Sequence, residues 1–210
     1  MVLFFKLCMP SNYTISTKFY ARKEAVPETN VSTKIVIYLI DPYLDFGKTL
    51  IIYNWYTSVE LAELLENRKT YYIGTLRSNR KSNPKEVINY KLQKGKCFSL
   101  SSDSNVMVMK WKDKRDIYMC STKITNRMVD IVKRNTISQK PETIMMYNKG
   151  KGCIDLSNQK ASYSNPLCRS MKWYRKVLMD ILLDTGVVNA ACLFNLTTKA
   201  ILPLHIFGLH

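Results

Sequence analysis

The first part of the chain shows strand-like spacing of its apolar positions. β-Branched and aromatic residues recur through the segments 2–7 and 13–22, and turn-forming residues at 10–12 separate the two segments. This arrangement predicts two strands joined as a β-hairpin. From Ser32 onward the apolar positions recur at helical spacing, which predicts a helix over residues 32–41 that ends before a proline.

A strand, a helix and a second strand follow. Residues 50–53 form a short apolar run, and residues 71–76 form another. Between them, Thr57 and Glu60 have the spacing of a capping box, and the leucines after them share one helical face. The pattern predicts a strand–helix–strand unit, with its helix packed on one face of a mixed sheet.

The second half changes in character. Residues 77–96 are basic and rich in turn formers, whereas residues 106–111 and 116–121 alternate with period two and predict a hairpin. Residues 142–147 follow a proline and are interpreted as a strand, with glycines at 150 and 152 marking a flexible approach to the next segment. Residues 171–194 predict a long amphipathic helix.

Composition and charge narrow the class of protein. The 210 residues are 46% hydrophobic, which is enough apolar material for a globular core. They carry a formal net charge of +16. Such an excess favours a polyanionic partner, with nucleic acid as the leading class. No apolar run reaches the ~20 residues that span a bilayer, so we expect no membrane partner. We also expect no small-molecule substrate.

The excess of positive charge gathers between Asn67 and Cys97, where nine basic residues stand against one acidic residue. The candidate DNA-binding residues are Arg77, Arg80, Lys81, Lys85, Lys91, Lys94 and Lys96. Four aromatic residues lie among them, and these could stack on exposed bases: Tyr71, Tyr72, Tyr90 and Phe98. The alternative is a solvated basic surface whose aromatic residues only fill the sheet.

Four motifs give the chain a family resemblance. They are GTLRSNRKSNPKEV (74–87), KWKDKRDIYMCST (110–122), YNKGKGCIDLSNQ (147–159) and MKWYRKVLMDILLDTGVVNA (171–190). In order and spacing they resemble blocks of the piggyBac-type transposases, as do FYARKE, STKIVIYLIDPYLDFG and IIYNWYTSVELAELL nearer the start. The chain is therefore identified as a piggyBac transposable element-derived protein.

The resemblance implies an α/β fold, an RNase H-like mixed sheet flanked by helices and interrupted by a small β-rich insertion domain. The implied divisions are residues 1–80 and 141–200 for the two parts of the RNase H-like domain, 81–140 for the basic insertion, and 201–210 for a truncated tail. The family's N-terminal dimerisation and DNA-binding region and its C-terminal zinc-binding region are expected to fall outside this chain.

Active members of the family use three aspartates to hold Mg²⁺ and cut DNA ends, with TTAA as the target sequence. The first acid falls at Cys8 or Met9 here, and Tyr53 occupies the position of the second. The third matches Asp155, whereas Asn158 replaces a supporting aspartate. Two Mg²⁺ ions need several hard oxygen ligands, so we expect neither bound metal nor another cofactor. Asp155 has an alternative role as a helix N-cap.

These observations predict a nuclear, catalytically inactive relic of a transposase with residual, non-specific DNA binding. The alternative is a protein-interaction module that pairs with full-length relatives or chromatin proteins. In that case Tyr53, Trp55, Tyr56 and Trp173 would lie in an interface rather than in the core.

Overall fold

The computed structural model describes residues 2–21, 30–133, 136–163, 172, 174 and 185–198. The chain forms two compact units. Residues 28–151 make up the first, here called the sheet unit, and residues 1–27 together with 152–210 make up the second, the hairpin unit.

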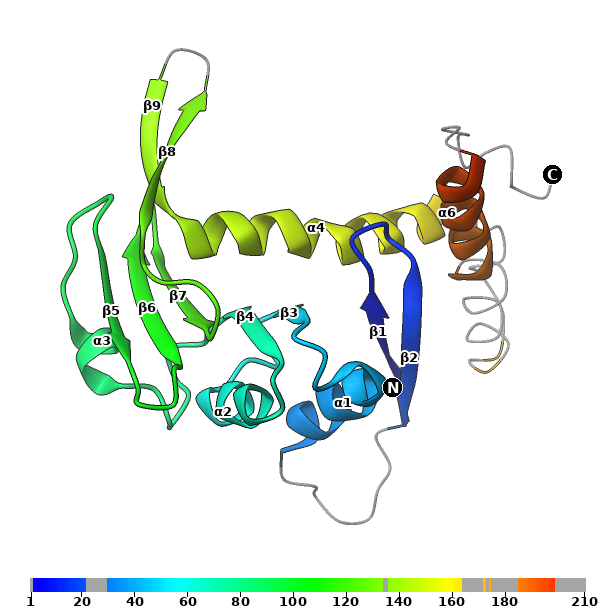
Figure 1. Ribbon diagram of the computed structural model, residues 1–210, viewed down its shortest axis with the longest axis horizontal. Helices are drawn as coiled ribbons and strands as arrows, with labels where there is room; N and C mark the ends of the chain where they lie inside the picture. The colour runs from blue at the N-terminus through cyan, green and yellow to red at the C-terminus, as the bar shows by residue number, and fades with distance from the viewer. Residues whose placement is uncertain are drawn as a thin grey trace. The chain divides into compact units, whose positions relative to one another are not determined.

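A five-stranded mixed sheet organises the sheet unit (Figure 1). Its strand order is β3 (Thr49–Ile52), β4 (Tyr71–Thr75), β7 (Asp116–Ser121), β6 (Met107–Lys112) and β5 (Cys97–Ser101). The β3–β4 pair is parallel and the other pairs are antiparallel. The predicted hairpin of residues 106–121 is confirmed, and its second strand pairs with β4 and so continues this sheet.

The helix between β3 and β4 is α2 (Val59–Asn67). Its N-cap is Ser58, whose Oγ accepts a hydrogen bond from the Leu61 N–H at 3.2 Å. The prediction that Thr57 is the N-cap is therefore wrong by one residue. The Thr57 hydroxyl instead donates to the Tyr53 carbonyl oxygen at 3.0 Å, which makes it part of the turn before the helix.

Helix α1 (Val31–Ile40) buries Ile35, Val36, Leu39 and Ile40. It begins one residue earlier than expected, after Asn30, which has a left-handed φ of 59°. The 3₁₀ turn η1 (Asp41–Tyr43) follows it directly. The proline inside that turn has no N–H to continue an α-helix, so α1 stops there.

The middle of the sequence contains four elements that its spacing did not predict. A short helix, α3 (Lys85–Asn89), lies within the basic segment, and the edge strand β5 follows it. Beyond the sheet, β8 (Met128–Lys133) and β9 (Thr136–Pro141) pair as a separate two-stranded ribbon.

The expected strand at residues 142–147 and the flexible glycine approach after it are wrong, because α4 (Glu142–Tyr163) runs through both. Its buried residues Thr143, Ile144 and Tyr147 recur at i, i+1 and i+4, which is helical spacing. Pro141 ends β9, and Glu142 stands in the first helical turn, where a carboxylate suits the helix dipole.

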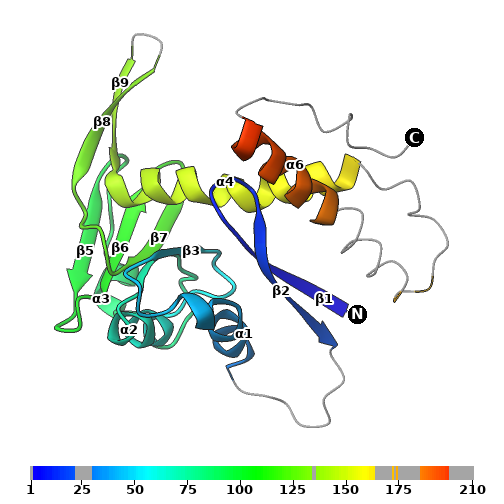
Figure 2. The ribbon, with the colours of Figure 1, turned by 45° about the vertical axis from the view of Figure 1, so that its right-hand side comes forward.

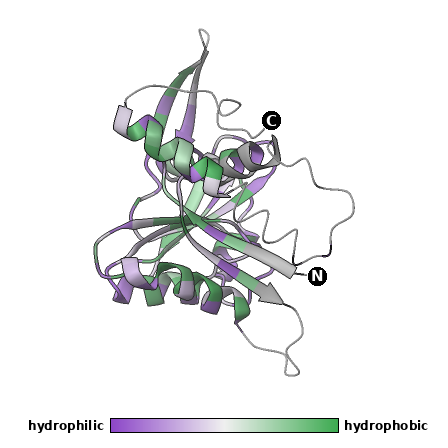
Figure 3. Cartoon of the chain, turned by 90° about the vertical axis from the view of Figure 1, so that its right-hand side faces the viewer, coloured by the Kyte–Doolittle hydropathy of each residue, from purple (hydrophilic) through white to green (hydrophobic). Residues whose placement is uncertain are grey.

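The sheet is covered on both faces. Ile144 and Tyr147 of α4 pack against Ile73, Met109 and Met119 on one face. Helix α2 packs on β4 and β7 from the other side (Figure 2). Hydrophobic positions run through the central strands and along α1 and α2 (Figure 3). The predicted mixed sheet flanked by helices is confirmed.

In the hairpin unit, β1 (Val2–Cys8) and β2 (Thr14–Ala21) form the predicted antiparallel hairpin. Helix α6 (Gly186–Thr198) is joined to it through Asn189, whose Oδ1 accepts from the Thr14 N–H at 2.8 Å and whose Nδ2 donates to the Thr14 carbonyl at 2.9 Å. Half of the amphipathic helix expected over 171–194, namely residues 171, 173 and 175–184, lies outside the described residues.

No helix within the described ranges is long and apolar enough to cross a bilayer. The expected domain boundaries at residues 80, 140 and 200 stay predictions.

Candidate nucleic-acid interface

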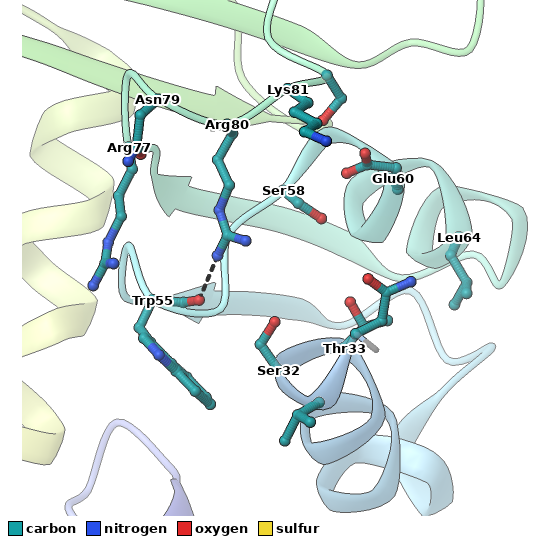
Figure 4. Close-up of a pocket in the computed structure, with 13 residues that line it drawn as sticks. Ser32, Thr33, Trp55, Ser58, Glu60, Leu64, Arg77, Asn79, Arg80 and Lys81 are labelled. Atoms are coloured by element: carbon teal, nitrogen blue, oxygen red, sulfur yellow. Dashed lines mark hydrogen bonds between the residues drawn. The ribbon is translucent and has the colours of Figure 1, made fainter. Parts of the chain in front are cut away.

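A cavity of about 720 Å³ lies in the sheet unit, where the starts of α1 and α2 meet the turn that follows β4 (Figure 4). Three separate stretches of sequence supply its walls. The lining residues are Asn30, Val31, Ser32, Thr33, Trp55, Ser58, Glu60, Leu64, Arg77, Asn79, Arg80, Lys81 and Ser82.

Two helix N-termini open onto this cavity. Helix α1 begins here with no hydrogen bond from the Asn30 side chain, and Ser58 caps α2. The first N–H groups of a helix have no partners within it and carry a partial positive charge. Both starts therefore favour an anionic group in the cavity. The sequence did not indicate that the start of α1 lines a site, although Ser32 and Thr33 are residues typical of a helix start.

Three cationic side chains line the same cavity: Arg77, Arg80 and Lys81. An Arg80 terminal nitrogen donates to the Trp55 carbonyl oxygen at 2.6 Å (Figure 4). The buried Nε of Arg80 has no acceptor in the described part of the chain. An oxygen-rich ligand would supply one.

The turn that carries these cations is fixed by Asn83, which is buried. Its Nδ2 donates to the Arg77 carbonyl at 2.8 Å and to the Ser78 carbonyl at 3.3 Å. These bonds close the turn that carries the cationic residues.

One carboxylate, Glu60, lines the same cavity as the three cations. Burial raises its pKa, but hydrogen bonds from Ser82 and Ser58 and the nearby Arg80 charge outweigh this, and the net pKa is lowered. Glu60 is therefore ionised at neutral pH, and the cavity keeps an excess of positive charge.

The other candidate DNA-binding residues lie outside this cavity. Lys85 is on α3, and Lys91, Lys94 and Lys96 are in the loop from α3 to β5. All four are exposed. The structure thus brings the first three candidates together and places the other four along the adjoining segment.

The four aromatic candidates differ in exposure. Tyr72 is fully buried in the core, so its ring offers no surface for stacking. The Lys123 ammonium lies 5.0 Å from the centre of the Tyr71 ring. Tyr90 and Phe98 stack on one another, with Tyr90 exposed.

The residues of the alternative interface hypothesis are partly buried. Trp55 and Tyr56 make an edge-to-face contact with ring centres 4.8 Å apart. Tyr53 is half-buried as well, and Trp173 lies outside the described residues.

Tyr53, at the position where the resemblance implies the family's second acid, has a phenol with a bond of its own. The Tyr53 hydroxyl donates to the Lys151 carbonyl oxygen of α4 at 3.0 Å. This bond ties the end of β3 to the helix within the sheet unit.

The other acid positions belong to the hairpin unit. The Cys8 sulfur lies 3.5 Å from the Thr14 hydroxyl oxygen, and Met9 is exposed. Asp155 is an exposed residue inside α4, so its expected alternative as an N-cap is wrong. Asn158 lies one turn further along the same helix.

These donors do not fit a pair of Mg²⁺ ions. Mg²⁺ takes hard oxygen ligands, whereas a thiol or thioether and a hydrogen-bonded phenol stand at two of the three positions that the resemblance implies. Across the described ranges, no three His, Cys, Asp or Glu side chains gather in a group that could hold a metal ion.

Comparison with known proteins finds a solved structure with a similar fold and a matching family model. The chain is similar to a piggyBac transposase solved by cryo-electron microscopy in a synaptic complex with hairpin DNA, with a TM-score of 0.80 and 22% sequence identity. The match covers 97% of this chain and 44% of that transposase, and it shows that the two share a mixed α/β fold. A family model described as Transposase IS4 matches residues 2–191. The chain therefore belongs to the transposase family of that model, as a member of piggyBac type.

Proposed function

We propose that this chain is a catalytically inactive piggyBac-derived domain that binds DNA through its basic surface with little sequence preference. The observation that carries the proposal is the cavity that Arg77, Arg80 and Lys81 line together with two helix N-termini. Phosphate oxygens are the acceptors that such a set of donors suits best.

The solved relative was captured with hairpin DNA, and this supports DNA as the partner class. The chain spans under half of that protein, so the activity of the whole transposase does not transfer with the fold. A DNA-bound role is also the reason that we propose a nuclear location.

Inactivity is proposed from the chemistry of the donors. One carboxylate, Asp155, remains of the three that the resemblance implies. A two-metal mechanism needs ligands that bridge and hold both ions. The protein incubated with Mg²⁺ or Mn²⁺ and a hairpin or nicking substrate should leave the DNA strands intact. Cleavage that disappears in Asp155→Asn would overturn this part of the proposal.

DNA binding is tested by fluorescence anisotropy with a labelled duplex at several salt concentrations. Each phosphate contact should steepen log K against log salt by ~0.9. We expect Arg77→Gln with Lys81→Gln to weaken binding and to flatten the slope by up to about two contacts. Arg80 is left unchanged because it also holds the Trp55 carbonyl.

The matched control is Lys114→Gln with Arg115→Gln, which removes the same charge from the exposed β6–β7 turn. Equal losses in the two double variants would mean that net charge, and not the cavity, attracts DNA. No binding by the unaltered protein at low salt would overturn the proposal.

A further inference from the structure

We propose that Tyr90, backed by Phe98, is a stacking platform for an unpaired nucleobase. This inference rests on the proposed DNA binding and assigns it a second contact, outside the cavity. The class of ligand is a single-stranded or unpaired nucleotide, because bases inside a duplex hide their faces from side chains.

The two rings are already arranged as a stack. Their centres are 4.2 Å apart and their planes differ by 9°. Within the described residues, Phe98 is the ring that Tyr90 contacts. Tyr90 is nonetheless 48% exposed. One face of the tyrosine is therefore supported while about half of the residue's surface meets solvent, as a base-stacking side chain requires.

A buried lysine holds the platform in place. The Lys110 ammonium donates to the Tyr90 carbonyl at 2.8 Å and to the Ile88 carbonyl at 2.9 Å. Lys110 on β6 lies directly across from Phe98 on β5, and so it fixes Tyr90 above the strand that carries Phe98. A ring that is ordered before binding loses less entropy when a base stacks on it.

The charge beside the platform suits a nucleotide. Lys91 follows Tyr90 in the sequence, and Lys94 and Lys96 complete the same loop, all three exposed. The Gly95 N–H donates to the Lys112 carbonyl at 2.7 Å, which anchors the loop to β6. An aromatic face with several lysines around it combines base stacking with phosphate contact.

The test compares a labelled single-stranded oligonucleotide with a duplex of equal phosphate number. Tyr90→Ala should weaken binding to the single strand by roughly tenfold, because it removes one stacked base. It should change duplex binding by less than about twofold. Tyr90→Phe keeps the ring and should bind both as the unaltered protein does.

The matched control is Tyr38→Ala, which removes another exposed tyrosine, on α1 and outside the basic segment. It should change neither affinity. The Lys110 bond uses the main-chain carbonyl of Tyr90, so the alanine variant keeps it, and thermal unfolding checks the fold. A second readout uses the unaltered protein: 2-aminopurine in the single strand should lose fluorescence on binding.

The outcomes separate this inference from the proposed function. Duplex binding by the unaltered protein, with equal single-strand affinity in Tyr90→Ala and no quenching, would overturn the platform and leave the DNA-binding proposal standing. An equal loss for single-stranded RNA would support a platform for unpaired bases in general. No binding to any nucleic acid at low salt would overturn both.

Discussion

At the scale of single residues, Tyr53 connects two elements through one hydrogen bond. Its hydroxyl bonds the Lys151 carbonyl in the partly buried junction between β3 and α4. We expect Tyr53→Phe to lower the free energy of unfolding by about 1 kcal/mol, the usual net value of one such hydrogen bond. Urea denaturation measures it. Tyr43→Phe, on an exposed residue, is the control and should cost much less. Equal stability of both variants would contradict the structural role.

Lys110 is the clearest case of a buried charge with partners. Besides its two carbonyl acceptors, its ammonium lies 3.2 Å from an Asp116 carboxylate oxygen. Hydrogen bonds from Lys112 and Lys110 lower the pKa of Asp116. Asp116→Asn should therefore destabilise the protein by about 1 to 2 kcal/mol at neutral pH. The loss should shrink as the pH falls through the usual range for an aspartate, and it should vanish only below the lowered native pKa, where the native carboxylate is protonated too.

Asp113→Asn is the control for this effect, because Asp113 lies in the same β6–β7 turn. Chemical denaturation of both variants at neutral pH and near pH 3 gives the comparison. A loss that is the same at both pH values would show that the charge of Asp116 is not its cause.

At the scale of elements, spacing worked where each element carried its own signal. The β1–β2 and β6–β7 hairpins and the β3–α2–β4 unit were predicted because turn formers and caps bounded them. Helix α4 was misread because its glycines at 150 and 152 and a preceding proline resemble a strand followed by a loop. Tertiary packing of Ile144 and Tyr147 decided the outcome, and a local pattern does not contain that information.

The two glycines of α4 differ in what surrounds them, and this makes a matched pair. A Cβ added at Gly152 would meet no atom within 4 Å. A Cβ at Gly150 would overlap the Ile51 side chain. Gly152→Ala should therefore stabilise the protein by up to about 1 kcal/mol through helix propensity. Gly150→Ala should lose that gain to the displacement of Ile51.

Thermal and urea unfolding of the two alanine variants would measure this difference. Equal stabilisation by both substitutions would mean that Ile51 yields without cost. A destabilised Gly152→Ala would mean that residue 152 does not lie within a helix in solution.

At the scale of the whole molecule, the charge was easier to predict than the site. The excess of lysine and arginine in the basic segment can be counted from the sequence. The cavity cannot be found from the sequence, because its lining comes from three stretches that only the fold brings together. They are residues 30–33, the segment with Ser58 and Glu60, and residues 77–82. The Tyr90–Phe98 stack was equally hidden, because it is a contact between a loop and the edge strand β5. Lys110, from a third segment, holds the loop in place by donating to the Tyr90 carbonyl.

The stability of the whole chain should show a plateau bounded by acid and by alkali. Asp45, Glu60 and Asp116 have lowered pKa values, through Arg68, Ser82 and Lys112 among others. Their contributions are therefore present above the usual carboxyl range and are lost as the pH falls through the lowered native pKa values. On the alkaline side, burial raises the pKa of Cys120 from 9.0 to about 12. The folded state keeps a thiol proton that the unfolded chain releases, and stability is therefore lost as the pH rises above 9.0.

The loss at high pH gives the sharper test. Cys120 should account for about 2 kcal/mol between pH 9 and about pH 10.5, since each unit of separation corresponds to ~1.4 kcal/mol. Tyr56, whose pKa burial raises to about 12, adds to the fall at still higher pH. In Cys120→Ala the free energy of unfolding, measured in urea, should be lower at pH 7 but should decline less steeply above pH 9. If both proteins decline in parallel, Cys120 does not keep its proton in a buried site, and the packing of β7 against its neighbours differs from that described.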